Sequence, residues 1–194
     1  MKRFVTFLEK LAGVEVASEP VDGELSEKVI LVGNPNVGKS ALFNALTGRY
    51  VTVSNYPGTT VEISRGTSRA IGADVEIIDT PGMYSLLPIT DEERVAQRIL
   101  LRQTPRAIVH VIDAKNIERM LGLTLQLMEA GLPVILVLNM ADEARRVGVK
   151  IDAKKLEKIL GIPVVETVAT SGVGMKELAR RVRELPPQKQ ASDF

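Results

Sequence analysis

The residues best suited to chemistry in this sequence form a glycine-rich stretch that ends in a lysine and a serine. The stretch fits the pattern of Gly, four residues and Gly-Lys-Ser, and it reads Gly33-Asn34-Pro35-Asn36-Val37-Gly38-Lys39-Ser40. Glycines let a backbone turn tightly around an anion, and the N–H groups at a helix start can cradle phosphates. The pattern therefore predicts a phosphate-binding loop, in which Lys39 reaches the terminal phosphates and the Ser40 hydroxyl binds Mg²⁺.

The elements on either side of this loop are those that the pattern requires. Residues 28–32 are a short apolar run rich in β-branched side chains, which predicts a buried strand. Residues 41–48 place Leu42, Phe43 and Leu46 at helical spacing, so a helix should follow, and its first residue, Ala41, is included in the predicted binding site. A plain glycine turn with a chance Lys-Ser is the alternative, and the strand–helix context argues against it.

Two further segments carry groups that can bind Mg²⁺ or respond to a γ-phosphate. Asp79 ends a predicted strand and can hold Mg²⁺, usually through water, while Gly82 can donate its N–H to the γ-phosphate. Thr60 is the candidate for a second hydroxyl on Mg²⁺, with Thr59 as its rival; the alternative is that either residue only opens a strand. Nucleotide contacts are predicted along both segments, at Asn55, Gly58, Thr59, Thr60, Asp79, Thr80, Pro81 and Gly82.

The segment Asn139-Met140-Ala141-Asp142 is a candidate for recognising a nucleotide base. It follows an apolar run and fits Asn-x-x-Asp, in which the Asp carboxylate can accept hydrogen bonds from the ring N–H and the exocyclic amine of guanine. Adenine lacks this donor pair, and a site built on paired hydrogen bonds discriminates strongly. Nucleotide contacts are therefore predicted at Asn139, Met140 and Asp142, with backbone contacts from a loop that would cover the base, at Ala169 and Thr170.

The composition is that of an ordinary globular protein. Of the 194 residues, 45% are hydrophobic and 25% are charged, and the net charge is +1, so no strong field indicates a nucleic acid or an anionic membrane as a partner. The sequence has no Cys, hence no disulfide and no thiolate metal site, and its single His, His110, sits in an apolar run typical of a strand. No apolar run is long enough to span a bilayer and no signal peptide is visible, which predicts a cytoplasmic location.

The order of apolar runs predicts an α/β fold. Strands expected at 61–71, 75–79, 107–112, 134–138 and 163–166 join the strand at 28–32 in a mostly parallel, six-stranded sheet with helices on both faces, and a hairpin adds one antiparallel strand. Residues 49–60 are expected to form a loop. Helices are expected to be capped by Thr90, Asn116 and Asp152, and to bury Leu125 and Ile159 among other residues. Residues 1–26 are expected to form a short helix and a linker, residues 27–185 the globular domain, and residues 186–194 a tail.

Taken together, several segments resemble the GTPase domain of FeoB, the ferrous-iron transport protein of bacteria and archaea. These segments are residues 33–40, 55–62, 79–86, 113–119, 123–127 and 138–143, and the resemblance covers residues 28–184. It implies a Ras-like P-loop fold, binding and hydrolysis of GTP with Mg²⁺, and a membrane permease of an iron transporter as partner, at the cytoplasmic face of the membrane. The alternative is a free-standing soluble regulator of another assembly, such as the maturing ribosome, that is gated by GTP and has no role in iron.

The group that stabilises charge during hydrolysis is not obvious from the motifs. Many small GTPases orient the attacking water with a Gln after Asp-x-x-Gly, but this chain has Met83 at that position. Arg65 and Arg119 remain candidates for an arginine that stabilises the charge on the phosphates. In FeoB and its potassium-activated relatives, the residue matching Asn36 holds K⁺ beside the phosphates, so the resemblance implies that role for Asn36; the alternative is that Asn36 only braces the loop. The predicted catalytic residues are Asn36, Lys39, Thr60 and Gly82.

Overall fold

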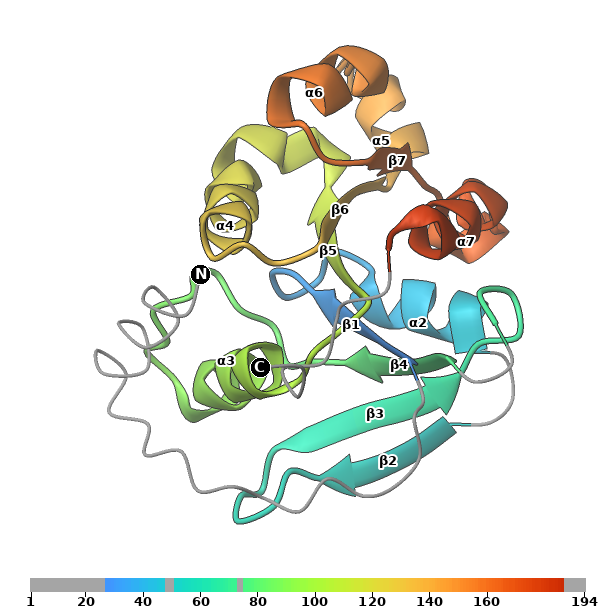
Figure 1. Ribbon diagram of the computed structural model, residues 1–194. Coiled ribbons are helices and arrows are strands. Elements are labelled where there is room, and N and C mark those ends of the chain that lie inside the picture. Colours follow the sequence, from blue (N-terminus) through green and yellow to red (C-terminus); the bar gives the residue numbers. More distant parts are fainter. Residues whose placement is uncertain (1–26, 48–50, 73–74, 187–194) are drawn as a thin grey trace.

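A seven-stranded sheet forms the centre of the computed structural model, which describes residues 27–47, 51–72 and 75–186 (Figure 1). The strands lie in the order β2-β3-β4-β1-β5-β6-β7; β4, β1, β5, β6 and β7 pair in parallel, and β3 pairs antiparallel with β2 and β4. The predicted α/β class is confirmed. The bounds are β1 Glu27–Val32, β2 Val51–Asn55, β3 Glu62–Thr67, β4 Val75–Asp79, β5 Ala107–Asp113, β6 Val134–Asn139 and β7 Val164–Glu166.

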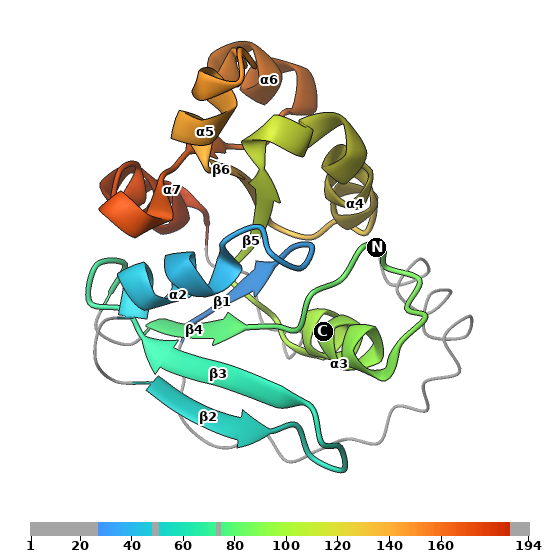
Figure 2. The same cartoon turned by 180° about the vertical axis from the view of Figure 1, so that it is seen from behind.

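Helices cover both faces of the sheet, as the two opposite views show (Figures 1 and 2). Helices α2 and α7 share one apolar cluster with the sheet, α3 and α4 share a second on the other face, and α5 and α6 contribute to a third beside β6 and β7. The bounds are α2 Lys39–Thr47, α3 Asp91–Arg102, α4 Ile117–Glu129, α5 Ala141–Arg146, α6 Ala153–Leu160 and α7 Met175–Glu184, with 3₁₀ turns at Ala114–Asn116 and Ala169–Ser171.

Strand β1 shows why the central strands have continuous apolar sequences. Val29 and Leu31 belong to the cluster that includes α2, whereas Ile30 and Val32 belong to the cluster that includes α3 and α4, and all four are 0% exposed. A parallel strand with helices on both faces buries every side chain instead of every second one. The sequence pattern of this strand was therefore a direct consequence of its central place in the sheet.

The six strands predicted from the sequence leave out β2, which lies at the edge of the sheet. All five of its residues are exposed, so the short alternation of Val51 and Val53 with Thr52 and Ser54 marks no buried face, and residues 49–60 were wrongly expected to form only a loop. Strand β3 is shorter than its predicted range of 61–71. It ends at Thr67, and the next residue, Ser68, already makes turn hydrogen bonds to Gly72 and Val75.

Two of the three predicted helix caps are confirmed. Thr90 and Glu93 form a capping box at the start of α3, and Asp152 accepts a backbone N–H at 2.9 Å at the start of α6. The third prediction is wrong, because Asn116 makes no capping hydrogen bond. Its side-chain amide donates to Asp113 at 2.9 Å across the 3₁₀ turn that precedes α4.

Two helical positions that were predicted to be buried are exposed. Leu125 is 47% exposed on α4, whose fully buried residues are Leu123, Thr124 and Leu127. Ile159 is 70% exposed on α6, an outer helix that has no fully buried residue. Both side chains lie next to the apolar stripe of their helix in sequence but point away from the sheet.

The N-terminal helix and linker predicted for residues 1–26 lie outside the described residues, as does the predicted tail beyond residue 186. Within the part of the chain that the structure describes, no helix combines the length and the apolar character needed to cross a membrane.

Candidate nucleotide-binding site

The candidate site lies at the carboxyl edge of the parallel strands, where the predicted segments meet. The loop of residues 33–38 follows β1, residues 80–82 follow β4, and residues 140–142 follow β6. In open α/β sheets, ligands bind in the crevice outside these strand ends. Direct hydrogen bonds join the segments, since the Met83 N–H donates to the Gly33 carbonyl oxygen at 3.0 Å.

Two glycines of the first loop are required by its packing against neighbouring strands. A Cβ on Gly33 would lie 2.2 Å from the Val111 carbonyl oxygen in β5, and a Cβ on Gly38 would lie 2.3 Å from Nδ2 of Asn139. Gly38 also has a φ of 80°, which glycine adopts without steric cost. Helix α2 begins at Lys39, so the free N–H groups of its first turn lie at the end of this loop.

The loop also contains two asparagines with oxygen atoms that the fold does not use. Asn36 is exposed and has a φ of 63°, a left-handed conformation that residues other than glycine seldom adopt. The Oδ1 atom of Asn34 is buried and accepts no hydrogen bond from the described residues. Each asparagine therefore brings an amide oxygen to the phosphate loop without a partner in the described part of the chain.

Lys39, Ser40 and Asp79 form the polar centre of the site. Nζ of Lys39 lies 2.8 Å from Oδ1 of Asp79, and the Ser40 hydroxyl donates to Oδ2 of Asp79 at 3.1 Å. The side chains of Lys39 and Asp79 are only 11% and 10% exposed, so the ion pair is largely shielded from water. A hydroxyl oxygen beside a carboxylate oxygen is the hard ligand set that Mg²⁺ takes together with water, so these residues fit a magnesium ion.

The segment after β4 touches the phosphate loop. A Cβ on Gly82 would lie 2.7 Å from Cγ of Pro35, so the two segments are in contact, as their predicted roles require. Thr80 serves the fold instead, because its buried hydroxyl donates to the Leu31 carbonyl oxygen at 2.8 Å and links β4 to β1. The structure therefore leaves the Thr80 side chain without access to a nucleotide.

Thr59 and Thr60 occupy different environments. The Thr59 hydroxyl donates to the Tyr56 carbonyl oxygen at 2.9 Å and accepts the Val61 N–H at 3.2 Å, which fixes a local turn. Thr60 is exposed, and none of the described hydrogen bonds involves its hydroxyl. Of the two candidates for a second hydroxyl on Mg²⁺, the structure favours Thr60. The neighbouring predicted contacts Asn55 and Gly58 are exposed on the same segment.

Asn139 links the phosphate loop to the loop expected to cover the base. Its side chain is 2% exposed, and its amide donates to the Val37 carbonyl oxygen at 2.9 Å. Its Oδ1 accepts the Thr167 hydroxyl at 3.0 Å and the Ala169 N–H at 3.1 Å. The first residue of Asn-x-x-Asp therefore organises the site from within and does not face the solvent.

Asp142 carries the carboxylate that is predicted to recognise guanine. It is exposed on the first turn of α5, and Nη2 of Arg146, one turn later, lies 3.5 Å from its Oδ2. Exposed ion pairs of this kind are weak, so the carboxylate can exchange Arg146 for another partner. Met140 turns the chain between β6 and α5 with a φ of 57°, and Thr170 is exposed in the second 3₁₀ turn.

Comparison with known proteins assigns this arrangement to a family. A family model described as ferrous iron transport protein B matches residues 27–182. This chain belongs to the FeoB family. The FeoA/FeoB fusion protein of Porphyromonas gingivalis is 46% identical over 152 residues, and the FeoB transporter of Synechocystis is 37% identical over 171 residues. The matches cover 78% and 86% of this chain but 18% and 28% of those relatives, so the chain spans less than a third of their length.

Solved structures of FeoB proteins share the fold. A mutant NFeoB of S. thermophilus bound to GDP has a TM-score of 0.78 and 42% identity, and the match covers 83% of this chain and 63% of that one. The cytosolic domain of L. pneumophila FeoB also has a TM-score of 0.78, with 40% identity over 82% of this chain and 69% of that one. These likenesses confirm the predicted Ras-like P-loop GTPase fold.

In this FeoB-family chain, Glu93 not only caps α3 but also accepts backbone hydrogen bonds from the segment that precedes the helix. Its carboxylate accepts the N–H groups of Tyr84 at 3.2 Å, Ile89 at 2.8 Å and Thr90 at 3.3 Å, and so fixes the segment after Gly82. Burial acts to raise the pKa of the Glu93 carboxyl, but these backbone hydrogen bonds outweigh burial and hold the pKa below its usual value. The charged carboxylate is therefore the form that holds the segment.

Two glutamines fix the middle of the same segment. The Gln97 amide on α3 is fully buried and donates to the Leu86 carbonyl oxygen at 2.8 Å. Oε1 of Gln126 on α4 accepts the Leu86 N–H at 2.7 Å and the Ser85 hydroxyl at 3.2 Å. Neither glutamine was predicted from the sequence, although the position of Gln97 within the apolar stripe of α3 was an available signal.

Proposed function

We propose that this chain is the GTP-binding and GTP-hydrolysing switch domain of a ferrous-iron transport system. The observation that carries the proposal is that Asp79 and Asn139 lie on two sides of the phosphate loop. Asp79 lies against Lys39 at the start of α2, and Asn139 holds the other side of the loop. The relatives agree with this function, since a solved NFeoB protein binds GDP and the curated relatives are Fe(2+) transporters.

In this proposal, different residues around the loop bind different parts of the nucleotide. Lys39 and the loop N–H groups would bind the phosphates, while Ser40, Thr60 and Asp79 would hold Mg²⁺, whose positive charge would offset that of the phosphates. Lys39 lies 2.8 Å from Asp79, so Lys39 would give up this contact in order to bind phosphate, and Asp79 would then be free to hold the metal. Asp142 recognises guanine, and Gly82 responds to the γ-phosphate.

Hydrolysis in this proposal is accelerated by K⁺. The position after Asp-x-x-Gly holds Met83, which is 0% exposed and cannot orient water. Arg65 is paired with Glu76 at 3.2 Å between β3 and β4, which commits its charge elsewhere. Asn36, exposed within the phosphate loop, offers the side-chain oxygen that would hold K⁺ beside the phosphates, where the cation supplies the charge that an arginine supplies in other GTPases.

The catalytic part of the proposal is tested by GTP turnover in K⁺ and in Na⁺ at equal ionic strength. We expect turnover about tenfold or more faster in K⁺, with GDP affinity little changed. Asn36→Ala should abolish the response to K⁺ and keep GDP binding. Asn44→Ala, on an exposed position of α2, is the matched control and should respond to K⁺ as the unaltered chain does. Equal turnover in both salts would refute the role of K⁺.

The transport part of the proposal places the domain at the cytoplasmic face of the membrane, next to a permease domain or chain. The support is that the matched relatives are Fe(2+) transporters more than three times as long as the matched region. A pull-down from solubilised cell membranes, made with the chain loaded with a GTP analogue or with GDP, tests it. Recovery of a multi-span permease is expected, and recovery of ribosomal particles would overturn the link to iron.

A further inference from the structure

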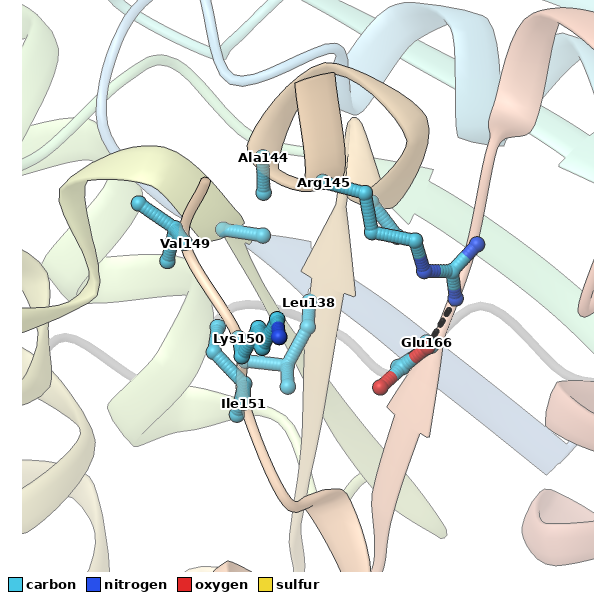
Figure 3. A pocket seen from close by; sticks show the side chains of 9 residues that line it. Leu138, Ala144, Arg145, Val149, Lys150, Ile151 and Glu166 are labelled. Carbon is cyan, nitrogen blue, oxygen red and sulfur yellow. Dashed lines mark hydrogen bonds and ion pairs between the residues drawn. The ribbon is translucent and has the colours of Figure 1, made fainter. Parts of the chain in front are cut away.

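A cavity of about 380 Å³ opens beside α5, between the ends of β6 and β7 and the segment that joins α5 to α6 (Figure 3). Its volume lies within the range of about 300–1,000 Å³ that is typical of small-molecule sites. None of the residues that line it belongs to the predicted nucleotide contacts. The cavity is therefore a separate feature of the fold, and its existence does not depend on the proposed function.

The cavity exists because small side chains face it from α5. Ala141 and Ala144 lie three residues apart on one face of the helix and are 5% and 2% exposed. Leu138 from β6 lines the cavity between them and the opposite wall, where Figure 3 shows Val149 and Ile151. These five residues make a predominantly apolar interior, from which an apolar ligand would displace water favourably.

The polar groups of the cavity leave one positive charge without a partner. Arg145 and Glu166 form an ion pair along one side, marked by the dashed line in Figure 3. Lys150 also lines the cavity, and its ammonium group makes no ion pair or hydrogen bond with any described residue. The three charges sum to +1, so the cavity favours an anionic group over a cationic one.

We propose that this cavity binds a small molecule with an apolar body and a carboxylate group. The body, of about ten to fifteen non-hydrogen atoms, would fill the space between α5 and Ile151, and the carboxylate would pair with Lys150. An amine would meet the unpaired ammonium of Lys150, and a neutral molecule would leave that charge uncompensated. The chemistry of the lining thus selects the class of ligand by both shape and charge.

The site adjoins the elements that carry the base-recognition residues without overlapping them. Ala141 is the residue before Asp142, and Glu166 is the residue before Thr167, whose hydroxyl donates to Asn139. A ligand at this position would contact α5 and β7 from outside the nucleotide site. Its binding should therefore persist when GDP is present, which separates this proposal from occupation of the phosphate or base site.

The experiment uses 3-phenylpropionate as probe, with its neutral amide and with 3-phenylpropylamine as isosteres. Binding is followed by amide chemical shifts of the full chain, with and without saturating GDP. We expect the carboxylate to bind with a dissociation constant on the order of 1 mM, as is usual for a fragment of this size, and the other two probes about threefold or more weakly. The shifted amides should include those of Ala144, Val149 and Glu166.

Two variants and a control locate the interaction. Ala144→Phe fills the cavity and should lower affinity for the carboxylate about tenfold. Lys150→Met keeps a long apolar side chain on the surface and should bring the carboxylate to the affinity of the amide, so the test does not depend on the folding of the first variant. Lys158→Met, on exposed α6, should have no effect. Equal affinities for all three probes, shifts confined to other residues, or unchanged binding by Lys150→Met would each overturn the proposal.

Discussion

The side-chain amide of Asn139 donates a 2.9 Å hydrogen bond to the carbonyl oxygen of Val37, 102 residues earlier in the chain. Because Oδ1 of the same side chain also accepts the Thr167 hydroxyl and the Ala169 N–H, one buried group holds three loops in register. The geometry of the phosphate loop thus depends on a residue that belongs to the base-recognition motif.

Replacement of Asn139 by alanine should destabilise the fold as well as the site. The change leaves the Val37 carbonyl, the Thr167 hydroxyl and the Ala169 N–H without a partner, and the expected cost is about 2–4 kcal/mol. Urea unfolding without nucleotide measures this cost. Asn44→Ala, on exposed α2, should change stability by less than about 0.5 kcal/mol. A cost below about 1 kcal/mol for Asn139→Ala would show that the three loops are held by other contacts.

Asp142→Asn should change the base that is preferred. The variant loses a charged acceptor of two hydrogen bonds, so GTP affinity should fall about 100-fold or more, while xanthine nucleotides, whose extra carbonyl suits an amide donor, should bind better than GTP. Competition binding with GTP, XTP and ATP provides the measurement. Arg146→Ala removes only the neighbour at 3.5 Å and should shift GTP affinity by less than about twofold. Equal affinity of the unaltered chain for ATP and GTP contradicts the assignment.

Glu93→Gln should loosen the segment that follows Gly82. The amide side chain is a weaker acceptor than the carboxylate, so the Tyr84 and Ile89 N–H groups should lose protection in hydrogen exchange, at a stability cost of about 1–2 kcal/mol. Glu92→Gln, one residue earlier and exposed, serves as control. In the unaltered chain, the differences in hydrogen-exchange protection between the GTP-analogue and GDP states should concentrate at residues 56–60 and 80–83. If the Tyr84 N–H kept full protection in Glu93→Gln, the Glu93 carboxylate would not be the group that fixes the segment after Gly82.

The buried His110 should make the protein sensitive to acid. Burial lowers the pKa of its ring from 6.5 to about 3, while Nδ1 lies 2.9 Å from the Thr124 hydroxyl. Between these two pH values the unfolded chain binds more protons than the folded one, so this contribution to stability is full above pH 6.5 and declines as the pH falls towards 3. At pH 5 the loss should be about 2 kcal/mol.

Urea unfolding at pH 7 and pH 5, compared between the unaltered chain and His110→Asn, isolates this effect. The variant has no ring to protonate and should lose about 2 kcal/mol less stability over the same interval. Identical losses in the two proteins would mean that other groups cause the sensitivity to acid.

The parts of the fold that could be predicted are those where burial leaves a pattern in the sequence. The strand of residues 28–32 and the capping box at Thr90 are such cases, because an unbroken apolar run and a Thr-x-x-Glu spacing each have one main structural meaning. Strand β2 was missed because its apolar alternation is limited to Val51 and Val53 and, with every residue exposed, reflects no buried face. Helix α5 was missed because its only apolar residues, Ala141 and Ala144, are too few to show a helical period.

Within the site, motif residues were easier to predict than the residues that hold them. Lys39, Ser40 and Asp79 meet as their spacing suggested, and Asn139 lies beside the loop. The sequence could not decide between Thr59 and Thr60 as the second hydroxyl on Mg²⁺, because only the structure shows that a local turn engages the Thr59 hydroxyl. Gln97 and Gln126 act through tertiary hydrogen bonds to one backbone position, Leu86, and no spacing in the sequence records such a contact.

The absence of a Cβ at Gly33 and Gly38 has a consequence for how the sequence can change over evolutionary time. Any other residue would collide with the Val111 carbonyl oxygen or with the Asn139 amide, both of them groups of the protein itself. Selection for a folded chain is therefore enough to preserve these glycines. A descendant that had lost its nucleotide would still carry them, and in such a descendant the polar positions Lys39, Ser40 and Asp142 would be the first to drift.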